Sequence, residues 1–259
     1  MAAQQEDYAF GLHAVGALIE QSPELVARVW IQNAPRSDRL AGLFGKARAA
    51  GVRVESVERR WLDQKLGPDC AHQGIIAMLQ VRELANSQAL MKHIEQAMAV
   101  DPGKVLLLLL DELQDSRNLG ACLRSAEAAG VTAVIVPKRR SAPINSLTRK
   151  TAAGAAESLF IAGVTNMVRT IEDLQKLGVW VYATSDAASS GYLQADLTGP
   201  CALVVGNEEQ GVRRLVLERC DATLSLPMHG NVESLNVSVA TGILLYEVLR
   251  QRGVQDPGG

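Results

Sequence analysis

From residue 105 onward, short unbroken apolar runs alternate with segments whose apolar positions recur at helical spacing. The runs predict strands at 105–110, 132–137, 158–162, 179–184, 201–206 and 222–227. The intervening segments predict helices at 119–130, 146–157, 167–178 and 213–220, with a last helix ending near 252. Strands that are apolar throughout and alternate with helices are typical of a parallel sheet covered on both faces. The pattern therefore predicts an α/β fold for this part of the chain.

A smaller α/β block precedes it. The pattern there predicts helices at 11–21 and 39–51 and strands at 26–32, 52–57 and 73–81. A polar, helix-prone segment then leads to "DPGK" at 101–104, which is a turn signal. We therefore expect a small domain at 1–82, a linker at 83–102, a larger domain at 103–252 and a tail at 253–259.

The composition favours a soluble globular protein. Of the 259 residues, 47% are hydrophobic and 21% are charged, which is an ordinary balance for such proteins. The polar start of the chain argues against a signal peptide, and the longest apolar run is far shorter than the roughly 20 residues that span a bilayer. We expect a cytoplasmic location and no membrane partner.

The four cysteines, Cys70, Cys122, Cys201 and Cys220, form no Cys-x-x-Cys pair. Their spacing to the four histidines does not match that of a zinc site. We interpret all four as reduced and mostly buried, and we expect no metal.

The net charge of −2 argues against a protein that coats nucleic acid through bulk charge. A local cluster is nevertheless present, because Lys138, Arg139 and Arg140 stand together and Arg149 and Lys150 follow closely. A solvated surface explains such clusters more often than a binding site does.

In parallel sheets of this kind, ligands bind beyond the carboxyl ends of the strands. Three polar segments follow predicted strands, at 111–118, 206–211 and 228–236. The chain has neither the G-x-G-x-x-G nor the G-x-x-x-x-G-K-[ST] pattern, which argues against a dinucleotide dehydrogenase and a P-loop NTPase.

Three motifs at these positions resemble one family. They are "NLGACLRSA" at 118–126, "GNEEQG" at 206–211 and "SLNVSVA" at 234–240. Together and in this order they resemble the motifs of the SpoU-type RNA ribose 2′-O-methyltransferases, and the similarity covers about residues 101–252. "FGLHAVGALIE" at 10–20 and "HQGIIA" at 72–77 resemble, less specifically, the substrate-binding module of the branch that methylates bacterial large-subunit ribosomal RNA.

The resemblance implies a small N-terminal α/β substrate-binding domain and a C-terminal knotted parallel-sheet domain that binds S-adenosylmethionine. It implies methylation of a guanosine ribose 2′-hydroxyl in 23S ribosomal RNA or a large-subunit precursor, by a homodimer. Two alternatives stay open: a transfer-RNA ribose 2′-O-methyltransferase, and a non-catalytic RNA-binding assembly factor.

By resemblance, the catalytic residues are those in the three motifs: Arg124, Asn118, Glu208, Ser234 and Asn236. A guanidinium stays protonated and has no acceptor, so Arg124 is expected to hold a phosphate or stabilise the alkoxide rather than act as a base. The simpler interpretations are a surface arginine for Arg124 and a helix N-cap for Asn118.

The resemblance also implies that Gly206, Leu226 and Leu235 bind the cofactor, with the glycine allowing close approach to the backbone. Packing in the core is the alternative for both leucines. Lys138, Arg139 and Arg140 are expected to contact RNA phosphates. One departure is Ser116, where the family usually has proline; without the fixed φ of proline, the loop before the motif could be less rigid.

Overall fold

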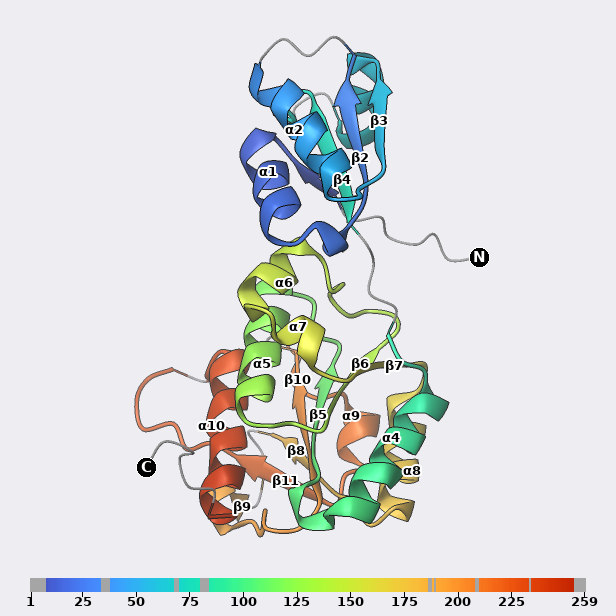
Figure 1. Ribbon diagram of the computed structural model, residues 1–259. Helices are drawn as coiled ribbons and strands as arrows, with labels where there is room; N and C mark the ends of the chain where they lie inside the picture. Colours follow the sequence, from blue (N-terminus) through green and yellow to red (C-terminus); the bar gives the residue numbers. More distant parts are fainter. Residues whose placement is uncertain are drawn as a thin grey trace. The chain divides into compact units, whose positions relative to one another are not determined.

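The computed structural model describes residues 8–33, 38–67, 70–79, 84–185, 188, 190–207, 210–232 and 234–253. The chain divides into two compact units, Met1–Arg82 and Glu83–Gly259. Both are drawn in Figure 1, and each is described by itself.

The first unit is built on a four-stranded sheet in the order β1-β4-β2-β3. Its strands are β1 (Tyr8–Phe10), β2 (Val26–Gln32), β3 (Val54–Val57) and β4 (Ile75–Leu79). Strands β2 and β3 are parallel, whereas β4 is antiparallel to both of its neighbours. This sheet is therefore mixed.

Helices α1 (Leu12–Gln21) and α2 (Asp38–Ala49) pack on one face of this sheet, and α3 (Arg59–Leu66) packs on the other. The sequence pattern did not predict α3, because most of its positions are polar. Leu62 nevertheless anchors the helix, since it is fully buried against Trp30 and Ile76. A short helix with few apolar anchors gives little periodic signal.

The second unit holds a seven-stranded sheet in the order β7-β6-β5-β10-β8-β11-β9. The strands are β5 (Leu106–Asp111), β6 (Ala133–Pro137), β7 (Ile161–Val164), β8 (Trp180–Thr184), β9 (Ser190–Gly191), β10 (Cys201–Gly206) and β11 (Ala222–Ser225). Every pair in it is parallel, which confirms the prediction of a parallel sheet. The knot stays a prediction.

Helices cover both faces of this sheet (Figure 1). One layer contains α5 (Ser116–Ala128), α6 (Ser146–Ala152), α7 (Ala155–Ser158) and α10 (Val237–Gln251). The other contains α4 (Ser87–Val100), α8 (Met167–Lys176) and α9 (Arg214–Leu217). Strand β5 serves both layers, because Leu108 belongs to the core beneath α5 and Leu109 to the core beneath α8. Burial on both sides is the reason for its unbroken run of leucines.

Three details differ from the sequence pattern. The segment 83–102, expected as a linker, contains α4, whose Leu90 and Ile94 are fully buried in the second unit. The helix expected at 146–157 is split into α6 and α7 by left-handed backbone at Ala153 and Gly154. Ile243 recurs at helical spacing with the buried Leu244 and Val248 of α10, which predicts burial, but it is 36% exposed.

Gly120 shows how closely the helices of one layer approach each other. A Cβ at this position of α5 would lie 2.6 Å from the carbonyl oxygen of Thr148 and from the Cβ of Thr151 in α6. The glycine of the first motif is therefore required by helix packing.

All four cysteines are free, as expected. Burial raises the pKa of the Cys201 thiol to about 11 and that of Cys220 to about 12. Within the ranges that the structure describes, no helix has the length and apolar character needed to cross a membrane.

Candidate active site

A cavity of about 480 Å³ lies at the carboxyl ends of β8, β10 and β11, against the start of α10. Its lining residues are Thr184, Ser185, Val205, Gly206, Asn207, Gln210, Gly211, Val212, Leu217, Leu224, Leu226, Met228, Ser234, Leu235, Val237 and Ala240. None of these side chains carries a formal charge. We call this hollow the apolar cavity.

Four residues that the resemblance assigned to the site, Gly206, Leu226, Ser234 and Leu235, line the apolar cavity together. The structure gives Gly206 a reason of its own to be glycine. A Cβ there would overlap the carbonyl group of Gly211 and the backbone nitrogen of Val212. The loop thus folds back onto the end of β10, and this close backbone approach is what excludes a side chain at Gly206.

A second hollow of about 340 Å³ shares one wall with the first. Its lining residues are Glu112, Gln114, Asp115, Asn118, Asn207, Gln210, Gly211 and Arg213. Asn207, Gln210 and Gly211 line both hollows, so the loop after β10 separates them. Because charged and amide side chains dominate its lining, we call it the polar cavity.

A third hollow, of about 500 Å³, is lined by Trp180 and Cys201 among others. These residues begin β8 and β10, so this hollow lies at the amino edge of the sheet. Ligands of open parallel sheets bind at the opposite edge, and none of the motif residues lines it.

Asn118 is not the N-cap of α5. That position belongs to Asp115, whose carboxylate accepts the backbone N–H groups of Arg117 at 2.7 Å and Asn118 at 2.9 Å. The Asn118 side chain instead accepts a hydrogen bond at its Oδ1 from the Nδ2 of Asn236, at 3.0 Å. Two residues that are 118 positions apart in the sequence therefore meet at the site.

Asn236, which stands immediately before α10, has two roles. Its Oδ1 accepts the backbone N–H of Ser238 at 2.9 Å and the Ser238 hydroxyl at 2.6 Å, so it caps α10. Its Nδ2 donates to Asn118. The residue thus caps one helix and joins that helix to α5.

The remaining predicted residues are not gathered at the two cavities. Arg124 is exposed on α5, lines neither cavity, and forms no ion pair or hydrogen bond with the residues that the structure describes. Glu208 lies outside the described residues. Lys138, Arg139 and Arg140 are exposed after β6, and Arg140 lies 3.8 Å from Glu112 at the polar cavity.

Ser116 is the first residue of α5, a position where proline is favoured because it supplies a suitable φ. Its hydroxyl accepts a hydrogen bond from the Nδ2 of Asn145 at 3.3 Å. Asn145 in turn caps α6 by accepting the N–H of Thr148. This hydrogen bond ties the start of α5 to α6 where the family usually has proline.

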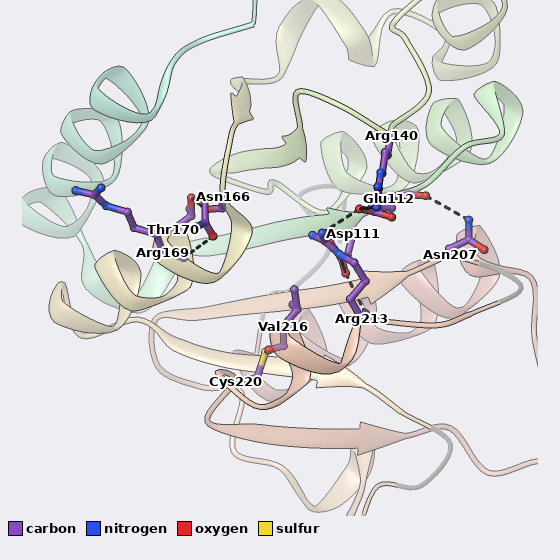
Figure 2. A network of polar contacts seen from close by, with 10 residues as sticks. All are labelled: Asp111, Glu112, Arg140, Asn166, Arg169, Thr170, Asn207, Arg213, Val216 and Cys220. Carbon is purple, nitrogen blue, oxygen red and sulfur yellow. Dashed lines mark hydrogen bonds and ion pairs between the residues drawn. The ribbon is translucent and has the colours of Figure 1, made fainter.

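An ion-pair network next to the polar cavity was missed by the sequence analysis (Figure 2). Asp111, the fully buried last residue of β5, accepts hydrogen bonds from the Nε and Nη2 of Arg213 at 3.0 and 2.5 Å. These bonds are the main reason why the pKa of the Arg213 guanidinium is raised. The one signal in the sequence was an aspartate directly after an apolar strand.

Family models match both units of the chain. Residues 105–246 match the SpoU rRNA Methylase family, and residues 8–84 match the domain described as RNA 2′-O ribose methyltransferase substrate binding. The first match covers more than half of the chain. This chain belongs to the SpoU methylase family.

Relatives of this SpoU methylase match it over almost its whole length. It is 45% identical to the 23S rRNA (guanosine-2′-O-)-methyltransferase RlmB of Yersinia pestis, over 95% of this chain and 98% of the relative. The corresponding protein of Pseudomonas putida is 43% identical, over 95% and 97% of the two chains.

A solved structure supports the fold. The SpoU methyltransferase AviRb from Streptomyces viridochromogenes, crystallised with AdoMet, aligns with a TM-score of 0.65 at 22% identity. The alignment covers 97% of this chain and 92% of AviRb.

The double role of Asn236 leads to a stability prediction. Asn236→Ala removes the cap of α10 and the bond to Asn118, and we expect the unfolding free energy of the second unit to fall by about 1 kcal/mol. Asn236→Asp keeps a capping oxygen and should retain nearly all of that stability. Thermal unfolding followed by the fluorescence of Trp180, with Trp30 and Trp61 replaced by Phe in all samples, measures both. Equal losses in the two variants would contradict the cap as the stabilising interaction.

Proposed function

We propose that this SpoU methylase transfers the methyl group of S-adenosylmethionine to the ribose 2′-hydroxyl of a guanosine in 23S ribosomal RNA, free or within a large-subunit precursor. The observation that carries this proposal is the coverage of the match. Both the methylase and the substrate-binding family models are present, and relatives named for this reaction align with nearly the whole chain.

The apolar cavity suits the cofactor. Its volume of about 480 Å³ is in the range of small-molecule sites, and its lining combines apolar side chains with backbone groups at strand ends. Leu226 and Leu235 would flank the adenosine, and the backbone beside Gly206 would meet it. S-adenosylmethionine would supply a methyl group carried on a positively charged sulfur.

The chain itself must hold the ribose and stabilise the negative charge that develops on the 2′-oxygen as the hydroxyl loses its proton. The new bond joins the 2′-oxygen to the methyl carbon while the bond from sulfur to that carbon breaks, and the proton passes to a phosphate or to water. Asn118 and Asn236, joined by their amides, are suited to orienting the ribose at the polar cavity. Ser234, from the lining of the apolar cavity, and Glu208 are proposed to assist them.

Arg124 is proposed to bind a phosphate or to stabilise the alkoxide. It stands six residues beyond Asn118, or about 9 Å along the helix. Its guanidinium has no partner among the described residues, so it is available to an RNA phosphate. We propose that Lys138, Arg139 and Arg140 bind further phosphates. Nothing in the site or among the near full-length relatives favours transfer RNA or a non-catalytic role.

We also propose that the protein is a homodimer and that it acts in the cytoplasm, where ribosomal subunits are assembled. Val239, Ile243 and Tyr246 recur at i, i+4 and i+7 along α10 and are 50%, 36% and 56% exposed. Residues at this spacing share one helix face. A second copy packing on this face would bury it.

Arg124→Ala should reduce methyl transfer to unmodified 23S ribosomal RNA on the order of 100-fold, because one charge-stabilising donor is removed. Its affinity for S-adenosylmethionine should not change, since Arg124 does not line the apolar cavity. Labelled cofactor measures transfer, calorimetry measures binding, and nuclease mapping locates the product. Arg169→Ala, an exposed arginine on α8, is the matched control. Full activity of the Arg124 variant would refute the assignment.

Replacing Lys138, Arg139 and Arg140 together by Ala should weaken RNA binding and flatten its salt dependence. Each RNA phosphate that the protein no longer neutralises makes the negative slope of log K against log salt shallower by about 0.7. A control that removes the same charge replaces Arg169, Lys176 and Arg219, which are exposed on α8 and just after α9. Fluorescence anisotropy at several salt concentrations compares the two. The same slope in both variants would exclude this cluster from the RNA site.

Val239→Glu combined with Tyr246→Glu should convert the dimer to a monomer, because two charges would have to be buried in an apolar interface. Sedimentation velocity at micromolar concentration measures the change. The control variant, Leu193→Glu combined with Leu215→Glu, adds the same two charges at exposed apolar residues outside α10 and should leave the dimer intact. A wild type that sediments as a monomer would overturn the proposal.

A further inference from the structure

The carboxylate of Asp111 is fully buried next to the polar cavity, and the Arg213 side chain and backbone satisfy it. Nε and Nη2 of Arg213 donate to Oδ1, and its backbone N–H donates to Oδ2 at 3.0 Å. Side chain and backbone of one residue are thus fixed to the end of β5. Figure 2 shows the arginine reaching across from the segment that follows β10.

Two further interactions join the same two segments (Figure 2). Arg213 Nη1 pairs with the Glu112 carboxylate at 2.9 Å, and the Nδ2 of Asn207 donates to the Glu112 carbonyl at 3.3 Å. Glu112 has a left-handed backbone, with φ of 59°, a conformation that costs energy in a residue with a Cβ. This strained turn is held in place by the bonds made to it from the second segment.

The loop between these anchors forms the wall shared by the two cavities. Asn207 and Gly211 exchange backbone hydrogen bonds at 3.1 and 2.8 Å, which closes the loop on itself. Arg213 then fixes the exit of the loop to Asp111. Asn207, Gln210 and Gly211 line both cavities. The ion pair of Asp111 with Arg213 therefore fixes the wall at which the two cavities meet.

We propose that Asp111 and Arg213 are positioning residues for methyl transfer: they set the loop residues Asn207, Gln210 and Gly211 so that the ribose oxygen in the polar cavity faces the methyl group in the apolar one. The inference rests on the proposed function. Neither residue lines the apolar cavity. Arg213 does line the polar cavity, but Asp111 and Glu112 already engage its guanidinium, so we assign both residues an action through the loop. Transfer is sensitive to such placement, since a shift of about 1 Å can cost roughly 100-fold in rate.

Stability alone does not explain the pair. Replacing a buried ion pair by uncharged residues that pack well is often neutral or stabilising, whereas removing one partner is costly. A positioning role requires the geometry of the guanidinium, because its planar fork fixes several donors at once and the single ammonium of lysine does not.

The experiment compares Arg213→Lys, Arg213→Met and the double variant Asp111→Asn/Arg213→Met. The double variant leaves no unpaired carboxylate at position 111, and its amide oxygen still accepts the backbone N–H of residue 213. Glu112 loses Arg213 in both Met variants but keeps Arg140 at 3.8 Å. The Met single variant should unfold at a lower temperature than wild type. In the double variant the unfolding temperature should recover while the single-turnover rate stays at least about tenfold below wild type, and Arg213→Lys should also be slow.

Arg214→Met is the matched control, because Arg214 is the next residue and, among the residues that the structure describes, its side chain pairs only with exposed Glu218. It should keep the wild-type rate. A double variant that regains both stability and rate, or a folded Arg213→Lys variant with the wild-type rate, would overturn the positioning role.

The affinity for S-adenosylmethionine, measured by calorimetry, separates this inference from the proposed substrate. If the wild type binds the cofactor but methylates no 23S ribosomal RNA, the proposed substrate is wrong. In that case a cofactor affinity lowered at least about tenfold in the double variant and unchanged in Arg214→Met would still support the role of the pair in setting the loop. Equal affinities would overturn it.

Discussion

A carboxylate buried in the core of a protein needs a partner of opposite charge, and this requirement organises the carboxyl edge of the sheet. Asp111 ends the interior strand β5 in a fully buried position. Its partner, Arg213, comes from beyond the neighbouring strand β10. Satisfying one charge therefore determines where the loop between β10 and α9 runs, and that loop separates the two cavities of the site.

The helical layer is tied to the same edge by helix caps and by an amide hydrogen bond rather than by ion pairs. Asp115 caps α5 and Asn236 caps α10, and the bond from Asn236 to Asn118 joins the two helix starts. The close approach of α6 at Gly120 holds α5 from its other side. The residues at the cavities are thus set by the starts of α5 and α10 and by the ends of strands.

The sequence predicted those parts that local patterns encode. Unbroken apolar runs identified most of the strands of the second unit, because both faces of its sheet are buried. The family resemblance pointed to four residues of the apolar cavity. The pairing of Asp111 with Arg213 joins residues that are 102 positions apart, and no local pattern encodes it. Periodicity also could not predict that Ile243 is exposed, because periodicity shows which residues share a helix face but not what covers that face.

The distribution of charge divides the proposed reaction between two regions. Among the described residues that line the two cavities, Arg213 is the one cation, and two carboxylates already engage it. A phosphate would therefore find no available positive charge inside either cavity. Arg124 and the cluster at 138–140 lie outside them and are exposed. In the proposed reaction a neutral ribose therefore suits the cavities, and the proposed phosphate contacts fall to the exposed cations outside them.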